Sequence, residues 1–165
     1  MPLYTEPIAE KNNAEAKAST PPPKYLLVYG SLMRCADTGN SEILEGATLV
    51  GYGHTQGGLG HGYSHLRMFD RGKFPYVCRD NTQYGYLIWG ELYTDIPQDT
   101  WDIIKEMEEY AGYGLEDVGG FYHYQGNRWI NGAKAWIYNS LQHARTFTEV
   151  QSGSWRNLAM QGGQA

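Results

Sequence analysis

The segment at residues 24–32 has the sequence KYLLVYGSL, and it limits the possible folds more than any other stretch of the chain. Five of its first six residues are apolar and suit a buried strand, and the pair Gly30-Ser31 then breaks the run. A buried strand that ends at Gly-Ser leaves backbone N–H groups unpaired and pointing outward. Because such a turn can hold a small anion such as a carboxylate, we expect an anion-binding turn at residues 30–32.

The composition fits one domain that is built largely from strands. The chain has 165 residues, of which 41% are hydrophobic, and this is enough for one core. Aromatic residues make up 14%, and 14 of them are Tyr. A tyrosine packs its ring on an apolar wall and keeps its hydroxyl at a polar tip. Many tyrosines therefore suit a β-rich shell around a polar pocket.

Charge and segment composition argue against several classes of protein. The net charge is −5 and the Lys and Arg residues are scattered, so we expect no nucleic-acid partner and no anionic membrane surface. The sequence has no apolar run of about 18 residues or more, which would be needed for a transmembrane helix. Its N-terminus lacks the apolar core of a signal peptide. Cys35 and Cys78 form no disulfide framework, so a reduced, cytoplasmic setting is expected.

Three segments differ in composition. Residues 1–23 are polar and end in Thr-Pro-Pro-Pro, which predicts a flexible N-terminal arm. Residues 24–145 carry the apolar runs and are expected to form the folded domain. Residues 146–165 are polar and rich in Gly and Gln, which indicates a loosely ordered C-terminal tail, although Trp155 and Leu158 could dock it onto the domain.

The apolar runs occur as strands, one clear helix and then strands. This order is typical of an α+β fold with a mostly antiparallel or mixed sheet, and not of alternating βαβ units. We expect the helix to start at Asp95, which can cap it, with Pro97 in its first turn, and to stop before Gly112. A shorter helix is expected at residues 140–145. Strands are expected at residues 24–29, 47–53, 65–69, 74–78, 84–93, 113–118, 121–124 and 134–138.

Two of these stretches have a special pattern. Residues 84–93 form the strongest predicted strand, and both of its alternating faces are apolar, which favours a central strand or a barrel wall backed by a helix. Residues 51–62 contain six glycines in twelve positions but lack the Gly-Lys-Ser/Thr of a phosphate-binding loop. A bulged strand or a wide loop is the better interpretation of the second stretch.

One acidic residue of the predicted helix falls on its apolar side. At about 100° per residue, Ile104 stands at the centre of the apolar face and Trp101 lies beside it. Glu108 lies about 40° from Ile104, whereas Glu106 and Glu109 lie about 140° to 200° away, on the solvent side.

A carboxyl group at position 108 is therefore either buried with partners or exposed to a cavity. Burial opposes ionisation and raises the pKa of a carboxyl group. A glutamate whose pKa is raised toward neutrality is a good proton shuttle. The alternative is a boundary glutamate whose carboxylate reaches the solvent, and the helical pattern alone leaves both open.

Five short motifs follow one another between residues 25 and 138. They are Tyr-Gly-Ser-Leu at 29–32, Phe-Pro-Tyr-Val at 74–77, Gly-Glu-Leu-Tyr at 90–93, Ile-Lys-Glu-Met-Glu-Glu-Tyr at 104–110 and Ala-Trp-Ile-Tyr at 135–138. In type, order and spacing they resemble the motifs of the γ-glutamylcyclotransferase-like proteins, including the AIG2-like branch. In that family the fourth motif carries an acid/base glutamate, and this glutamate aligns with Glu108.

The resemblance implies a fold and an activity. The fold is a small mixed or antiparallel β-barrel flanked by helices, in which the loop at residues 29–32 faces Glu108 across a cavity. The activity is that of an acyltransferase that releases 5-oxoproline from a γ-glutamyl amine or peptide. It uses one glutamate as acid and base and needs no metal or cofactor.

The resemblance also implies which residues contact the small-molecule γ-glutamyl substrate. The backbone N–H groups of residues 30–32 would hold its α-carboxylate or the developing oxyanion. Tyr29 and Tyr138 would orient it through their hydroxyls, unless both only pack in the wall. Ser31 is not expected to be a nucleophile, because the Gly-x-Ser-x-Gly elbow is missing. The expected substrate-binding residues are Tyr29, Gly30, Ser31, Leu32, Tyr76, Tyr113 and Tyr138.

The sequence departs from the family pattern at three places. Lys105 stands where the family has Asp, Glu109 stands where it has Gly, and Leu115 stands where an Arg is usual. These departures leave open a non-catalytic small-molecule-binding module on the same fold. The leaving group of the substrate and the oligomeric state are not determined by the sequence.

A metal site at His54, His61 and His65 is a further alternative. These residues lie in or beside the glycine-rich stretch, where a helix is not expected, and no Cys or carboxylate partners stand nearby. We therefore expect no metal site.

Overall fold

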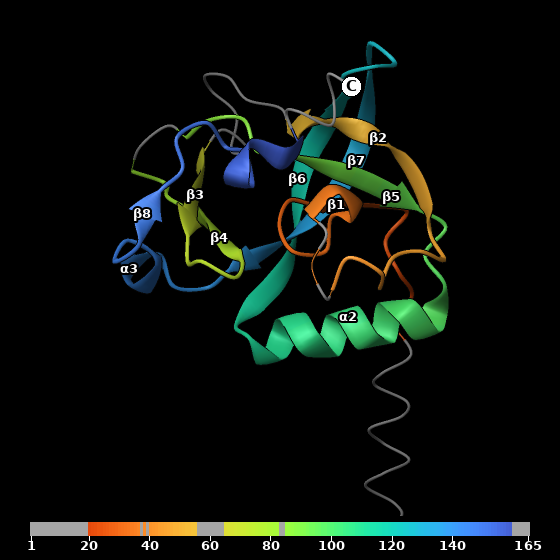
Figure 1. Ribbon diagram of the computed structural model, residues 1–165, viewed down its shortest axis with the longest axis horizontal. Helices are drawn as coiled ribbons and strands as arrows, with labels where there is room; N and C mark the ends of the chain where they lie inside the picture. The colour runs from red at the N-terminus through yellow and green to blue at the C-terminus, as the bar shows by residue number, and fades with distance from the viewer. Residues whose placement is uncertain (1–19, 37, 39, 56–64, 83–84, 160–165) are drawn as a thin grey trace, which may run out of the picture.

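Five strands close into a barrel, and a smaller sheet and a helix pack beside it (Figure 1). The structure is a computed structural model, and it describes residues 20–36, 38, 40–55, 65–82 and 85–159. Most of the predicted N-terminal arm, residues 1–19, lies outside this part. The prediction of an α+β fold with a small mixed barrel is confirmed.

The barrel contains both parallel and antiparallel pairs. Its strands follow the order β1-β5-β2-β6-β7. The pair of β1 and β7 is parallel, and the other four pairs are antiparallel. Apolar residues of β1 are buried between its two neighbours, as its sequence predicts. The bounds are Tyr25–Val28 for β1, Thr48–Thr55 for β2, Trp89–Thr94 for β5, Tyr113–His123 for β6 and Arg128–Tyr138 for β7.

A three-stranded sheet lies beside the barrel and carries a network of ion pairs. Its order is β4-β3-β8, with β3 at Leu66–Asp70, β4 at Pro75–Arg79 and β8 at Thr148–Glu149. Arg67 forms ion pairs with Asp80 at 3.2 Å and with Glu149 at 2.6 Å. Hydrogen bonds from Thr82, assisted by Arg145, lower the pKa of Asp80 to about 2. This network connects Arg145 and Glu149, which follow the barrel strands in the sequence, to β3 and to the residue after β4.

Residues 146–159 belong to the fold, so the prediction of a loosely ordered tail is wrong for them. β8 pairs antiparallel with β3, and the fully buried Trp155 donates its indole N–H to Asp70 at 3.1 Å. A two-residue strand is too short to give a periodic signal in the sequence. Docking through Trp155, the alternative that the sequence left open, is the arrangement observed. Residues 160–165 lie outside the described part.

The strand predicted at residues 84–93 is shorter than its apolar pattern indicates. β5 begins at Trp89, and residues 85–88 connect the small sheet to the barrel. The N–H of Tyr86 donates to the carbonyl of Leu66 at 3.2 Å, and the N–H of Ile88 donates to the hydroxyl of Thr55 at 3.0 Å. Ile88 is buried and residues 85–87 are half-buried, so apolar residues continue upstream of the strand without forming part of it. β5 itself lies between β1 and β2 in the barrel wall, as predicted.

Helix α2 spans Gln98–Tyr110 and packs under the barrel in the view of Figure 1. Trp101 and Ile104 are buried, which confirms the predicted apolar face. Pro97 occupies the N-cap position, and Asp95 lies outside the helix with φ of 53°, so the prediction that Asp95 caps the helix is wrong. Gly112 stops the helix as predicted, because its φ of 95° is a conformation that glycine adopts easily.

The described part of the chain also contains three short helical segments. They are η2 at Arg34–Ala36, α3 at Leu141–Ala144 and η4 at Trp155–Asn157. α3 confirms the short helix predicted at residues 140–145, and the hydroxyl of Ser140 caps it by accepting the N–H of His143 at 3.1 Å. No helix in the described part of the chain is long and apolar enough to cross a membrane.

The fully buried carboxylate of Glu91, on β5, holds the chain that leaves β1. Its Oε1 accepts the N–H of Arg34 at 2.7 Å and the hydroxyl of Tyr93 at 2.7 Å, and its Oε2 accepts the N–H of Cys35 at 3.1 Å. Hydrogen bonds to a charged acceptor are stronger than those to a neutral one. Glu91 thus fixes η2, and with it the turn between β1 and η2.

We predict that Glu91→Gln lowers the free energy of unfolding by about 2 kcal/mol, because the amide replaces a charged acceptor and turns an N–H group toward buried donors. Urea denaturation measures this loss. The control is Glu116→Gln, which changes a carboxylate that is 41% exposed in its pair with Arg79 and should cost about 0.5 kcal/mol or less. Equal stability of the Glu91 variant and the wild type would contradict this role.

Candidate active site

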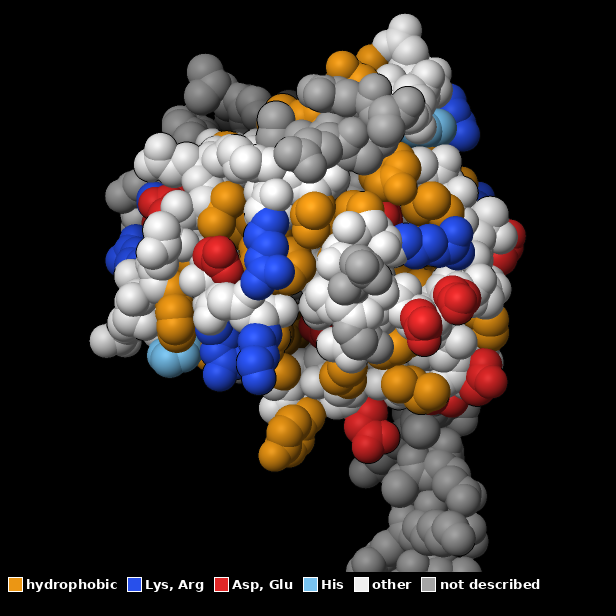
Figure 2. Space-filling model, in the orientation of Figure 1, with side chains coloured by type: hydrophobic (Ala, Val, Ile, Leu, Met, Phe, Trp, Pro, Cys, Tyr) orange, Lys and Arg blue, Asp and Glu red, His pale blue; other side chains and the backbone are white. Residues whose placement is uncertain are grey.

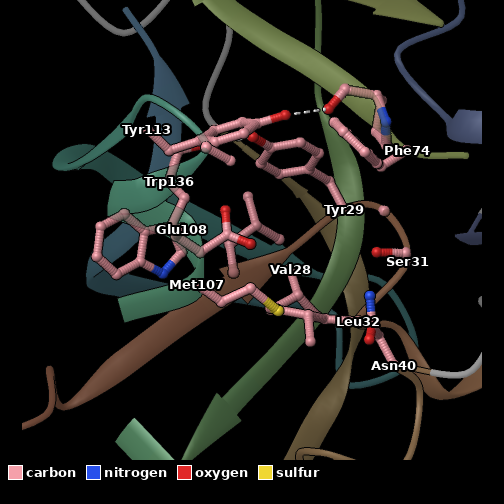
Figure 3. Close-up of a pocket in the computed structure, with 14 residues that line it drawn as sticks. Val28, Tyr29, Ser31, Leu32, Asn40, Phe74, Met107, Glu108, Tyr113 and Trp136 are labelled. Atoms are coloured by element: carbon pink, nitrogen blue, oxygen red, sulfur yellow. Dashed lines mark hydrogen bonds between the residues drawn. The ribbon is translucent and has the colours of Figure 1, made fainter. Parts of the chain in front are cut away.

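A cavity of about 120 Å³ lies between the end of β1, the start of β4 and the C-terminal half of α2 (Figure 3). Its walls combine apolar side chains with one carboxyl group and the turn that follows β1. The residues that line it are Leu27, Val28, Tyr29, Gly30, Ser31, Leu32, Asn40, Phe74, Pro75, Met107, Glu108, Ala111, Tyr113 and Trp136.

Glu108 supplies the carboxyl group of the cavity. Its side chain extends from α2 toward Val28 and Tyr29 of the β1 segment (Figure 3). It is partly buried, whereas Glu106 and Glu109 are exposed, as the helical pattern predicts. The structure thus places the carboxyl group in the wall of the cavity.

The electrostatics of Glu108 favour proton transfer near neutral pH. Within the described residues, its carboxylate accepts no hydrogen bond and forms no ion pair. Burial raises its pKa from 4.5 to about 7. At that pKa both the acid and the carboxylate are well populated at neutral pH, so one group can accept a proton and return it.

The turn at residues 30–32 forms another wall of the cavity. The carbonyl of Gly30 accepts the N–H of Met33 at 3.0 Å, which closes the turn. The backbone N–H groups of Gly30, Ser31 and Leu32 donate to no group in the described part of the chain. The turn therefore offers backbone donors beside the cavity, and the expectation that they hold an anion stays a prediction.

Gly30 is required by the close approach of Pro75. A Cβ atom at position 30 would lie 2.5 Å from Cδ and 2.9 Å from Cγ of the Pro75 ring. A proline ring has little freedom to move, so a side chain at position 30 would push the turn and the start of β4 apart. The first and second motifs of the sequence therefore touch each other at the cavity.

Two tyrosines line the cavity with their hydroxyls bound to backbone carbonyls. Tyr29 donates to the carbonyl of Trp136, and Tyr113 donates to the carbonyl of Pro75 at 2.9 Å. Burial, with the charge of Glu108 as a further contribution, raises the pKa of both tyrosines, so both stay neutral. Because Tyr29 donates its hydroxyl proton in this way, only the hydroxyl oxygen is left to accept from a ligand, and the expected orienting role stays a prediction.

The structure places the other two predicted tyrosines behind the wall. Tyr76 and Tyr138 stack with ring centroids 3.8 Å apart and planes at 22°, and neither lines the cavity. The Tyr76 ring lies 6.0 Å from that of Tyr113. The pair supports a cavity residue by packing, which is the alternative that the sequence left open for Tyr138.

Several lining residues were not singled out by the sequence. Asn40 reaches the cavity because its N–H donates to the hydroxyl of Thr38 at 3.2 Å, and that hydroxyl donates to the carbonyl of Ser31 at 2.6 Å. This link depends on how the loop folds back and has no signal in sequence spacing. Phe74 and Pro75 belong to the motif at residues 74–77, and Met107 and Trp136 belong to predicted elements. The sequence does not indicate that the side chains of these residues line the cavity.

None of the three departures from the family pattern lines the cavity. Lys105 and Glu109 form an ion pair at 3.1 Å across one turn of α2. Neither residue lines the cavity, and neither does Leu115, which lies on β6. The altered positions therefore leave the cavity wall itself unchanged.

The histidines considered for a metal site do not form one in the described part of the chain, where no group of three or more His, Cys, Asp or Glu side chains is placed to hold a metal ion. His54 packs against Trp89 with ring centroids 4.7 Å apart, and burial lowers its pKa. His61 lies outside the described residues.

Comparison with known proteins identifies the fold. No family model matches the sequence, and no curated protein matches it significantly. An uncharacterized protein from Pyrococcus horikoshii matches the structure with a TM-score of 0.56 and 19% identity, over 83% of this chain and 93% of that one. A uropathogenic E. coli-specific protein matches with a TM-score of 0.54 and 20% identity, over 83% and 95%.

An AIG2-like protein from Mus musculus matches with a TM-score of 0.54 and 14% identity, over 78% of this chain and 86% of that one. The chain therefore has the same fold as this AIG2-like protein. This is the fold that the five sequence motifs predict.

We predict that Gly30→Ala lowers the free energy of unfolding by about 1–3 kcal/mol, because the new methyl group overlaps the Pro75 ring. Chemical denaturation measures the change. Gly114→Ala on β6 is the matched control, since its Cβ would meet no atom within 4 Å. A Gly30 variant as stable as the Gly114 variant would show that the turn is not held against Pro75.

Proposed function

We propose that the protein is a γ-glutamylcyclotransferase, an enzyme that releases 5-oxoproline from a γ-glutamyl amine or peptide. The observation that carries the proposal is the carboxyl group of Glu108, whose pKa burial raises to about 7. It shares a cavity with the backbone N–H groups of residues 30–32, which donate to no group in the described part of the chain. The five sequence motifs and the fold shared with the AIG2-like protein from Mus musculus support the same activity.

The proposed reaction is intramolecular and needs no nucleophile from the protein. The α-ammonium of the γ-glutamyl group loses a proton, and its nitrogen attacks the γ-carbonyl carbon to form a five-membered ring. The ring nitrogen then gives up its second proton and the C–N bond to the leaving amine breaks. The leaving nitrogen takes up both protons and departs as an ammonium. Holding the γ-glutamyl chain in a folded conformation supplies much of the rate, because ring closure depends on proximity.

Glu108 is the acid and base in this scheme. As a carboxylate it accepts the proton of the α-ammonium, and as an acid it delivers a proton to the leaving nitrogen. A carboxyl group whose pKa is near neutrality suits both steps better than one with an ordinary pKa. The apolar wall that raises its pKa also keeps bulk water from competing for the proton.

The turn at residues 30–32 is the anion site in this scheme. Its backbone N–H groups hold the α-carboxylate of the γ-glutamyl group or the oxyanion that forms at the γ-carbonyl. Because these donors are part of the backbone, they are fixed before the substrate binds. Tyr29 and Tyr113 contribute neutral ring surface, since their hydroxyls are bound to carbonyls.

We predict that Glu108→Gln reduces 5-oxoproline release from γ-glutamyl amides at least about 100-fold, because the amide cannot carry the proton. A chromatographic assay of 5-oxoproline across γ-glutamyl amines and γ-glutamyl amino acids measures the rate. The matched control is Glu109→Gln, which removes an exposed carboxylate from the next position of α2 and should keep the wild-type rate.

Equal turnover by the Glu108 variant would remove this residue from the mechanism. The same panel tests the alternative of a binding module. In that case 5-oxoproline and γ-glutamyl amides would raise the melting temperature of the wild type while no compound in the panel is turned over.

We also predict that kcat/KM rises with pH through an apparent pKa near 7. Glu108 must be ionised to accept the proton, and burial raises its pKa to about 7, so activity is lost as the pH falls below that value. A pH–rate profile between pH 5 and 9 on one γ-glutamyl substrate measures this limb. A limb near pH 4.5, the ordinary value for Glu, would contradict the assignment.

A further inference from the structure

A second hollow adjoins the cavity and carries positive charge. It is lined by Arg71, Lys73 and Phe74, which belong to the turn between β3 and β4. Phe74 lines both the cavity and this hollow. A ligand that extends out of the cavity past the Phe74 ring therefore meets two cationic side chains. In Figure 2, Lys and Arg side chains gather over the part of the face where β4 and α3 lie.

The two cations of this turn differ from the other basic residues near the small sheet. Arg67 and Arg145 are paired with Asp80, and Arg79 is paired with Glu116. Arg71 and Lys73 are exposed, and neither has a carboxylate partner within the described residues.

The guanidinium of Arg71 is nevertheless held in place. It lies 4.7 Å from the centroid of the Phe74 ring and 5.9 Å from that of Tyr76. Such contacts restrict the rotamers of an arginine while leaving its N–H groups free for a planar anion. A carboxylate accepts two parallel hydrogen bonds from such a fork.

Nearby charges do not neutralise the turn. Asp70 precedes Arg71, but its Oδ1 accepts the N–H of Gly72 at 2.8 Å and the indole N–H of Trp155 at 3.1 Å. Arg156 donates to the carbonyl of Gly72 and adds a third cation beside the turn. The hollow is thus positive, whereas the cavity next to it holds the carboxyl group of Glu108.

We propose that Arg71 and Lys73 bind a carboxylate on the leaving-amine side of the substrate, so that the substrates are γ-glutamyl amino acids or peptides rather than γ-glutamyl derivatives of neutral or cationic amines. This inference rests on the proposed function, which places the γ-glutamyl group in the cavity. The leaving group then lies past Phe74. When the γ-amide C–N bond breaks, the amino acid takes the proton on its nitrogen and leaves from the positive hollow.

The test uses two ligands that differ only in the carboxylate, γ-glutamyl-alanine and γ-glutamyl-alaninamide. Release of 5-oxoproline gives kcat/KM for each, and calorimetry on the Glu108→Gln variant gives both dissociation constants without turnover. We expect the wild type to prefer the acid by about tenfold, which corresponds to one charge-assisted contact of about 1.4 kcal/mol. The preference should shrink as salt is added, because the site is exposed.

The double variant Arg71→Gln/Lys73→Gln should lose this preference. Its kcat/KM and affinity for γ-glutamyl-alanine should fall, whereas those for γ-glutamyl-alaninamide should not change. Arg128→Gln, which removes an exposed arginine at the start of β7, is the matched control and should keep it. Equal turnover of the acid and the amide by the wild type, or an unchanged preference in the double variant, would overturn this inference and leave the proposed function intact.

The two proposals fail in different ways. Preferential binding of the acid that depends on Arg71 and Lys73, with no turnover of either ligand, would support the carboxylate site and remove the proposed function. An absence of any preference in both assays would overturn the carboxylate site whatever the turnover.

Discussion

The burial of one carboxyl group without a counter-charge is the constraint on which the site depends. Glu108 lines an apolar cavity, and no described side chain offers it a hydrogen bond or an ion pair. Such a group is destabilised as a carboxylate, and its pKa of about 7 is the direct result. The fold tolerates it because Trp101 and Ile104 bury the same face of α2 under the barrel and fix the helix. The buried side chains of α2 therefore stabilise the fold, and Glu108 is available for proton transfer.

A second buried carboxylate shows the opposite solution. Glu91 is fully buried and accepts hydrogen bonds from two backbone N–H groups and one hydroxyl, so it acts as an anchor. It holds η2, and the N–H groups of the turn before η2 lie beside the cavity with no partner among the described residues. Glu91, which accepts hydrogen bonds, thus fixes the turn that lines the cavity together with Glu108. One buried carboxylate has a structural role, and the other is available for proton transfer.

The sequence predicts the parts of this arrangement that depend on local pattern. The helical spacing places Glu108 beside Ile104, and the apolar run before Gly30 predicts the strand and the turn. Features that depend on long-range docking have no such signal. Trp155 packs against the small sheet and contacts Asp70, which is distant in the sequence. Asn40 lines the cavity because its loop folds back toward the turn at residues 30–32. Tyr76 and Tyr138 stack on each other behind the wall, which ring type and motif position do not reveal.

The central claim is that the carboxyl group of Glu108 is buried enough to titrate near neutrality. The most direct measurement is an NMR titration of ¹³C-labelled glutamate side chains between pH 3 and 9, in which the Glu108→Gln variant identifies the signal. The account predicts that the Glu108 signal titrates at about 7 and is missing in the variant. A signal for Glu108 that titrates near 4.5, the ordinary value for Glu, would contradict it.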